Sequence, residues 1–315
     1  MSGVCTGNLD TGFVALGYQK VAFLGVVQGI TELLPISSTA HMRVVPALLG
    51  WRDPGSAFSA AMQLAALIAV VSYFWRDVSD ISAGSLRAIR YRDFRSRDFK
   101  LGLWILLATL PLVIAGVGLA PVLNACSSPL RSLNLVALAC IVMAALLACA
   151  ELLARHRRTL DQVRFVDALV IGVAQVGALI PGVSRSGSTL TAALWLGLTR
   201  AEAARFSFLL GLPAIALAGV RELWELHQAH LPPHGWAVLA VGLIVASLSA
   251  YLAIWALMKI LERVSAWPFV IYRGALGALI LVLTASGRKR RAGTKFSLAI
   301  EGDLNGGMWM RADIG

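Results

Sequence analysis

Three long stretches of this chain contain no Asp, Glu, Lys or Arg; they cover residues 54–75, 101–130 and 231–258. Because an α-helix rises about 1.5 Å per residue, roughly 20 apolar residues cross the hydrocarbon core of a bilayer, and charge-free stretches of this length are typical of transmembrane helices. Charged residues make up only 14% of the chain, whereas soluble domains carry roughly 25%. This composition excludes an ordinary water-soluble domain and predicts an all-α, polytopic integral membrane protein.

The apolar runs between charge clusters predict six full transmembrane spans. These lie near residues 57–75, 101–121, 132–152, 204–220, 236–257 and 269–286. Residues 21–50 and 166–198 are also apolar, but Pro35 and Pro181 interrupt them, and a proline inside a helix removes a backbone donor. Non-helical backbone at membrane depth must be buried in protein or line a wet cavity. We therefore expect both regions to form re-entrant helix–loop–helix hairpins.

The formal net charge of +11 comes from basic residues that lie mainly between the apolar spans. They concentrate in two loops, 76–100 and 153–165, which the positive-inside rule assigns to the cytoplasm. The surplus of basic residues is thus explained by membrane topology, and no nucleic-acid partner is predicted. Six spans and two hairpins place the basic, predicted disordered tail 287–315 on the far side. Either the number of spans is wrong by one, or this tail does not direct topology.

An internal repeat relates the two hairpins. A shift of 147 positions aligns Gly25, Val26, Gln28 and Ser37 with Gly172, Val173, Gln175 and Ser184. Repeat one covers about residues 20–152 and repeat two about 166–286, within a single membrane domain, 1–286. Each repeat consists of one hairpin and three spans, and an odd number of crossings inverts the second copy. The expected fold therefore has two inverted-topology repeats, with a binding site near the midplane where broken helices meet.

Ionisable side chains at membrane depth are functional candidates because they are costly to place there, and the first hairpin holds several. Gln28 and Glu32 are four residues apart and share a helix face. A second half-helix that begins at Ser38 would offer free N–H groups and hydroxyls to an anion, and His41 can reach the Ser38 hydroxyl. These groups provide what phosphoryl transfer needs: a metal ligand, an anion cradle, and a base or nucleophile.

The second hairpin contains the run Pro181–Thr189, with sequence PGVSRSGST. Its glycines allow backbone N–H groups to approach an anion closely, and Arg185 can hold a phosphate through two parallel hydrogen bonds. If the inverted halves meet, Arg185 faces Glu32 and His41 across one site.

Structural explanations of the same residues stay open. Glu32 and Arg185 could form a buried ion pair that only joins the hairpins, and His41 could be a structural histidine. The small residues Ser186, Gly187 and Ser188 could serve close helix packing.

The two hairpins resemble a known family. Residues Gly25–His41, GVVQGITELLPISSTAH, and Pro181–Thr189 are similar to the two motifs of the undecaprenyl-diphosphate phosphatase family of bacitracin-resistance membrane proteins. Phe206–Pro213 resembles a third stretch of that family. The resemblance covers roughly residues 15–286, and nothing in the tail matches.

This resemblance implies a multi-pass enzyme of the bacterial inner membrane whose site opens toward the periplasm. Its reaction would be hydrolysis of undecaprenyl diphosphate to undecaprenyl phosphate and inorganic phosphate, which recycles the lipid carrier of peptidoglycan synthesis and gives bacitracin resistance. It also implies a divalent cation, Mg²⁺ or Ca²⁺. The family has Glu or Gln at the position of Gln28, so Gln28 is within the pattern but leaves one carboxylate fewer for the metal.

We predict that Glu32, Ser38, His41 and Arg185 are catalytic, and that Gln28 and Glu32 bind the metal. The nucleophile is Ser38 or His41, and where His41 is not the nucleophile it acts as the base. The residues expected to bind the substrate phosphates are Ser37, Thr39, Gly182, Ser184, Ser186, Gly187 and Thr189.

The expected partners are a polyprenyl diphosphate and the lipid bilayer. The sequence leaves the oligomeric state open, and a homodimer is one alternative. Two rival functions fit the same architecture. One is an inverted-repeat transporter or flippase for a phosphorylated lipid or anion, and the other is a non-catalytic lipid-binding scaffold.

Overall fold

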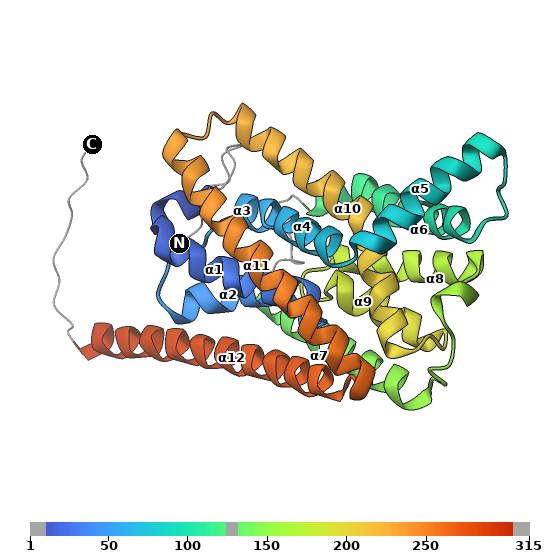
Figure 1. The fold of residues 1–315 in the computed structure, drawn as a ribbon. Coiled ribbons are helices and arrows are strands. Elements are labelled where there is room, and N and C mark those ends of the chain that lie inside the picture. The colour runs from blue at the N-terminus through green and yellow to red at the C-terminus, as the bar shows by residue number, and fades with distance from the viewer. Residues whose placement is uncertain (1–10, 124–131, 305–315) are drawn as a thin grey trace.

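The computed structural model describes residues 11–123 and 132–304 (Figure 1), and their regular structure is helical apart from one isolated bridge between Arg158 and Leu198. The predicted all-α class is therefore confirmed. The helices in chain order are η1 Gly12–Leu16, α1 Gly17–Leu33, α2 Ser38–Leu48, α3 Ser56–Ala61, α4 Gln63–Tyr73, α5 Trp75–Tyr91, α6 Arg97–Leu123, α7 Leu133–Leu153, η3 Leu160–Gln162, α8 Phe165–Val176, η4 Gly177–Leu179, α9 Arg185–Trp195, α10 Arg200–Gln228, α11 Pro233–Arg263 and α12 Trp267–Leu304.

Within the described residues, 6 helices are long and apolar enough to cross a membrane. Five of them, on α6, α7, α10, α11 and α12, coincide with predicted spans, which supports a polytopic membrane protein. The sixth, Gly12–Leu33, includes the first arm of a predicted hairpin. The predicted span 57–75 is helical as α3 and α4, with a turn at Met62, and the chain then bends by 82° into α5.

Residues 75–91 correct the sequence-based prediction, which treated 76–100 as a loop. They form α5, whose buried face contains Gly84 and Ala88 and packs on α6, whereas Arg87 and Arg90 are exposed. The many arginines concealed this helix in the sequence because they fall on its exposed face. α12 extends to Leu304 and so includes residues 287–304 of the predicted tail. Residues 305–315 lie outside the described part of the chain, and the disorder of the tail stays a prediction.

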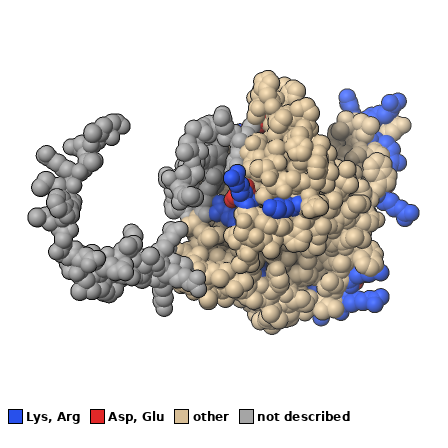
Figure 2. Space-filling model, turned by 90° about the vertical axis from the view of Figure 1, so that its left-hand side faces the viewer, with Lys and Arg blue, Asp and Glu red and all other residues tan. Residues whose placement is uncertain are grey.

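The outer surface of the bundle is largely apolar. Figure 2 shows a face with few charged side chains, and Lys and Arg gather mainly toward its right-hand edge. Large apolar side chains such as Ile114 on α6 and Leu248 on α11 are exposed. A face with few charged side chains, together with exposed apolar side chains of this size, fits contact with lipid tails.

Both hairpins have the predicted helix–break–helix form. α1 ends at Leu33, and α2 begins at Ser38 after the break that contains Pro35. α8 continues into η4, and α9 begins at Arg185 after the break that contains Pro181. In each case the chain leaves the helical path around the proline, as expected from its missing N–H group.

The first arm of each hairpin packs on a long helix from a distant part of the chain. α1 lies against α11, and α8 lies against α6, while α7 packs on α12. Glycines permit the close crossings: a Cβ on Gly29 would lie 2.4 Å from the Ala246 carbonyl oxygen, and one on Gly172 would lie 2.3 Å from the Ala108 carbonyl oxygen. This packing holds the two helix breaks inside the bundle, where they meet.

Candidate active site

The two breaks end in the same local geometry. Ser37 precedes α2 with φ of 72°, and Ser184 precedes α9 with φ of 65°. Each serine caps its helix: Ser37 Oγ accepts a hydrogen bond from the Ala40 N–H at 3.4 Å, and Ser184 Oγ accepts one from the Gly187 N–H at 3.2 Å. A positive φ is unfavourable for serine and is found mainly where the surroundings enforce it, often at functional sites.

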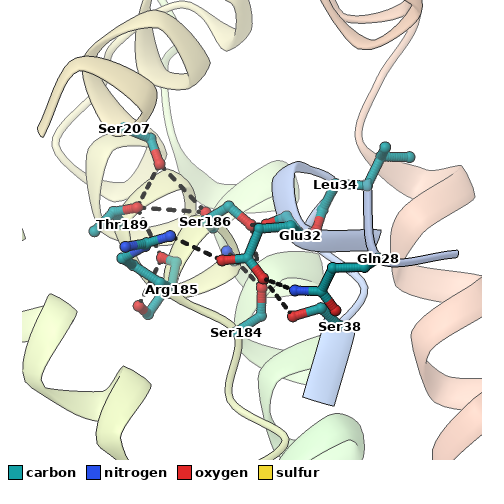
Figure 3. Close-up of polar contacts among 11 residues, drawn as sticks. Gln28, Glu32, Leu34, Ser38, Ser184, Arg185, Ser186, Thr189 and Ser207 are labelled. Atoms are coloured by element: carbon teal, nitrogen blue, oxygen red, sulfur yellow. Dashed lines mark hydrogen bonds and ion pairs between the residues drawn. The ribbon is translucent and has the colours of Figure 1, made fainter. Parts of the chain in front are cut away.

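Glu32 is at the centre of the contact between the hairpins (Figure 3). Its Oε2 accepts hydrogen bonds from Gln28 Nε2 at 3.0 Å and from Ser38 Oγ at 2.7 Å. Its Oε1 accepts one from Arg185 Nη2 at 2.8 Å, and the two charged side chains are only 10% and 15% exposed. The structure therefore brings Gln28, Glu32, Ser38 and Arg185 together, although they come from two hairpins far apart in the sequence.

Ser186 ties the hairpins together through backbone groups. Its Oγ lies 3.2 Å from the carbonyl oxygens of both Glu32 and Leu34, and 3.1 Å from Ser184 Oγ. These carbonyls lie at the C-terminal end of α1, where the helix itself leaves carbonyl groups without partners. Ser186 therefore has a structural task, and its predicted contact with phosphate stays a prediction.

Thr189 bonds to the backbone of Arg185 and not to Glu32. It is fully buried, its Oγ1 donates to the Arg185 carbonyl oxygen at 2.8 Å, and it also contacts Ser207 Oγ on α10. The threonine thus joins the first turn of α9 to α10. Thr39, by contrast, is exposed on the first turn of α2 beside Ser38.

Two glycines of the second hairpin have tight surroundings. Gly182 has φ of 99°, and a Cβ there would lie 2.6 Å from the Val136 carbonyl oxygen of α7. A Cβ on Gly187 would lie 2.5 Å from Arg273 Nη1. Packing therefore requires glycine at Gly182, whereas a side chain at Gly187 would displace the Arg273 guanidinium.

His41 is buried and points toward α12. Its Nδ1 lies 2.8 Å from the Ser37 carbonyl oxygen, which can only accept, so Nδ1 carries a proton. In the neutral ring Nε2 then accepts from the Tyr272 hydroxyl at 2.7 Å, and the two rings are nearly parallel, with centroids 5.7 Å apart. Both ring nitrogens of His41 are thus already engaged, and Tyr272 is a neighbour that the sequence did not suggest.

Arg273 is a second residue that sequence reasoning missed. It is only 1% exposed, and its Nη1 donates to the Pro35 carbonyl oxygen at 3.1 Å. Its Nη2 donates to the Gly182 carbonyl oxygen at 2.6 Å and also contacts that of Val183. A signal was present, because Arg273 is the only ionisable residue besides Tyr272 in the predicted span 269–286, and such residues are functional candidates.

The oxygen atoms around Glu32 suit a hard divalent cation. Gln28 Oε1 is buried and has no hydrogen-bond partner in the described part of the chain, although its amide nitrogen is bonded to Glu32. Carboxylate, amide and hydroxyl oxygens are ligands that Mg²⁺ and Ca²⁺ accept. Residues 11–123 and 132–304 contain no group of three or more His, Cys, Asp or Glu that could hold a metal. An ion here would therefore depend on one carboxylate, neutral oxygens and water.

The part of this chain that matches known proteins includes both hairpins. The family model described as bacitracin resistance protein BacA matches residues 21–279. Over 261 residues, the chain is 71% identical to Undecaprenyl-diphosphatase 2 of Mesorhizobium japonicum, an alignment that covers 83% of this chain and 99% of the relative. It is 52% identical over 272 residues to the Undecaprenyl-diphosphatase of Gloeobacter violaceus, with 86% and 93% covered. It is 49% identical over 265 residues to that of Synechococcus elongatus, with 84% and 92% covered.

Proposed function

Because the chain belongs to the family of bacitracin resistance protein BacA, we propose that it removes the terminal phosphate of undecaprenyl diphosphate at the place where its two hairpin breaks meet. The products are undecaprenyl phosphate and inorganic phosphate, so the enzyme returns the lipid carrier to cell-wall synthesis, and bacitracin resistance follows. The observation that carries the assignment of the site is that one carboxylate, Glu32, binds both the Ser38 hydroxyl and the Arg185 guanidinium.

Ser38 is the nucleophile in this proposal, and Glu32 is its general base. The 2.7 Å hydrogen bond from Ser38 Oγ to Glu32 Oε2 is the contact expected between an activated hydroxyl and the base that takes its proton. His41 is less suited to attack phosphorus, because its nitrogens are bonded to Ser37 and Tyr272. The geometry therefore favours one of the two nucleophiles that the sequence left open.

The reaction then has two steps. Ser38 Oγ attacks the terminal phosphorus, its proton passes to Glu32, and the bond from that phosphorus to the bridging oxygen breaks, which releases undecaprenyl phosphate. Glu32 passes that proton to the departing undecaprenyl phosphate and is again a carboxylate. Water next attacks the phosphoserine and gives one proton to Glu32 as it does so. The bond between phosphorus and Ser38 Oγ breaks, the serine oxygen takes a proton back from Glu32, and inorganic phosphate leaves.

Arg185 supplies the charge that this chemistry needs. Within the described residues its guanidinium has one hydrogen-bond partner, Glu32, so the rest of its planar fork is available to phosphate oxygens. The arginine begins α9, whose free N–H groups and dipole add further positive potential. Before substrate arrives, Glu32 and Arg185 neutralise each other, which lowers the cost of burying either charge.

We further propose that Gln28 Oε1 and Glu32 would hold the divalent cation, Mg²⁺ or Ca²⁺. When bound, the cation supplies Lewis-acid polarisation of the phosphoryl oxygens. Gln28 itself has two tasks, since its amide nitrogen orients the Glu32 carboxylate at 3.0 Å while its amide oxygen is left for a ligand.

The two halves of the chain are proposed to be inverted repeats in the inner membrane, with the site open to the periplasm. The matched serine caps at Ser37 and Ser184 support this arrangement. So does the exchanged packing, in which α1 lies on α11 and α8 lies on α6. The basic segments 76–100 and 153–165 then face the cytoplasm.

The deciding experiment measures phosphate release from farnesyl or undecaprenyl diphosphate by protein purified in detergent, with and without a chelator. Detergent solution has no separate compartments, so a transporter or a lipid-binding scaffold would release no phosphate there. Cation-dependent release that is lost in Glu32→Ala and Arg185→Ala supports the proposal. Near wild-type rates in either variant would contradict the assignment of the site.

A further inference from the structure

We propose that Arg273 is a positioning residue: its guanidinium joins the two hairpin breaks and thereby sets Arg185 and Ser38 at the right distance from Glu32. This inference rests on the proposed phosphatase function, because the property that it explains is the rate of that reaction. It assigns a task to a charged residue of α12 that contacts none of Glu32, Ser38 or Arg185 by a hydrogen bond in the described structure.

The contacts of Arg273 are divided between the hairpins. Nη1 donates to the Pro35 carbonyl oxygen of the first break at 3.1 Å, and Nη2 donates to the Gly182 carbonyl oxygen of the second at 2.6 Å, with Val183 beside it. Carbonyls in such breaks have no helical partner, and an unpaired buried carbonyl is costly. One planar guanidinium satisfies acceptors from both breaks, which a single neutral side chain does not do as well.

These contacts are close to the reacting groups along the backbone. Pro35 lies between Glu32 and Ser38, and Val183 lies two residues before Arg185. The first turn of α9 also rests on the guanidinium, since a Cβ on Gly187 would lie 2.5 Å from Arg273 Nη1. A shift of this side chain therefore moves the backbone that carries the site residues of both hairpins.

Anchoring of α12 does not explain this arginine. α12 already packs along α7, where buried Ile280 meets Val136, Ala137 and Cys140. A charge at membrane depth is expensive, so an apolar residue would serve helix packing better. The geometry also argues against direct contact with the substrate, because Arg273 is only 1% exposed and both of its Nη atoms donate to carbonyl oxygens.

The test compares Arg273→Gln and Arg273→Lys in full-length protein, with kcat and KM measured on farnesyl diphosphate and the Tm measured in the same detergent. The matched control is Arg158→Gln. Arg158 also donates to two carbonyl oxygens, those of Leu196 at 2.8 Å and Gln162 at 2.7 Å. It pairs with Asp167 as well, and all of these contacts join segments away from the breaks. A displacement of reacting groups by about 1 Å lowers the rate of the chemical step by roughly 100-fold. We expect a fall of about that size in kcat for Arg273→Gln, with KM within about threefold of wild type.

Arg273→Lys should recover part of that loss, roughly tenfold, because the ammonium keeps the charge but not the planar fork. Arg158→Gln should lower the Tm and keep kcat. A folded Arg273→Gln variant with wild-type kcat, or one with a raised KM and unchanged kcat, would overturn the proposal. If Arg273→Gln does not fold, Arg273→Lys decides: a reduced kcat at unchanged KM supports the inference, and wild-type kcat refutes it. Failure of the wild-type protein to release phosphate would instead refute the proposed function.

Discussion

Replacing Glu32 by glutamine tests the chemistry and the electrostatics of the site in one variant. The amide has nearly the shape of the carboxylate, so Gln28 and Ser38 keep a neighbour, but the proposed base and the negative charge opposite Arg185 are lost. Loss of a general base lowers kcat by about 100- to 10,000-fold. By the relation between rate and barrier, this corresponds to roughly 3–5.5 kcal/mol of transition-state stabilisation.

The same change should destabilise the fold, because it leaves Arg185 without an anion. The two side chains are 10% and 15% exposed, so the pair is mostly buried, and removal of one partner of a buried pair costs up to about 3–5 kcal/mol. The double variant Glu32→Gln/Arg185→Gln has no unpaired charge. Its Tm should therefore be higher than that of Glu32→Gln alone, with a coupling energy of about 0.5–3 kcal/mol.

Phosphate release and thermal unfolding of the detergent-solubilised variants give both quantities. The matched control is Glu151→Gln, which removes the carboxylate of another mostly buried pair, Glu151 with Arg200. This control should lose stability and keep kcat per folded molecule. The reasoning is refuted if Glu32→Gln retains kcat within tenfold of wild type, or if the double variant is no more stable than the single one.

Three further predictions concern other parts of the structure. Rapid quenching during turnover, followed by mass spectrometry, should find phosphate on Ser38, and His41→Ala should leave that adduct detectable; an adduct on the histidine would reverse the assignment. Gln28→Glu should lower the Mg²⁺ concentration needed for half-maximal activity, because it adds a carboxylate ligand, whereas Gln28→Leu should raise it; equal titration curves for all three proteins would exclude Gln28 as a ligand. Gly172→Ala should cost about 1–3 kcal/mol of stability, because its Cβ would lie 2.3 Å from a carbonyl oxygen of α6. Gly116→Ala, whose Cβ would have ordinary contact at 3.8 Å, should unfold like wild type, and similar Tm values for the two variants would contradict the close crossing.

The parts of the site that the sequence predicted follow from two strong local signals. Pro35 and Pro181 predict the breaks because a proline cannot continue the hydrogen bonding of a helix. Glu32 and Arg185 stand out because charges are rare at membrane depth. The predicted repeat led us to expect that they meet, and Arg185 Nη2 lies 2.8 Å from Glu32 Oε1.

Other features could not be predicted because they depend on the direction of a side chain or on distant packing. The sequence does not say whether a serine such as Ser186 faces a ligand or a neighbouring carbonyl, and here it bonds to the end of α1. Tyr272 joins His41 only because α12 passes the first hairpin. Arg273 is a charge in an apolar span, but nothing near it in the sequence indicates that it reaches the carbonyl groups of both breaks.

Ser38 and Arg185 occupy the same position in the two hairpins, since each is the first residue of the half-helix that follows a serine cap. In a symmetric pair of identical chains, both places would hold the same side chain, either two hydroxyls or two guanidiniums. Neither pair could offer an attacking oxygen and a cation to one phosphate. Joining two such hairpins in one chain removes that identity, so the two half-helices can begin with different side chains after the same kind of serine cap.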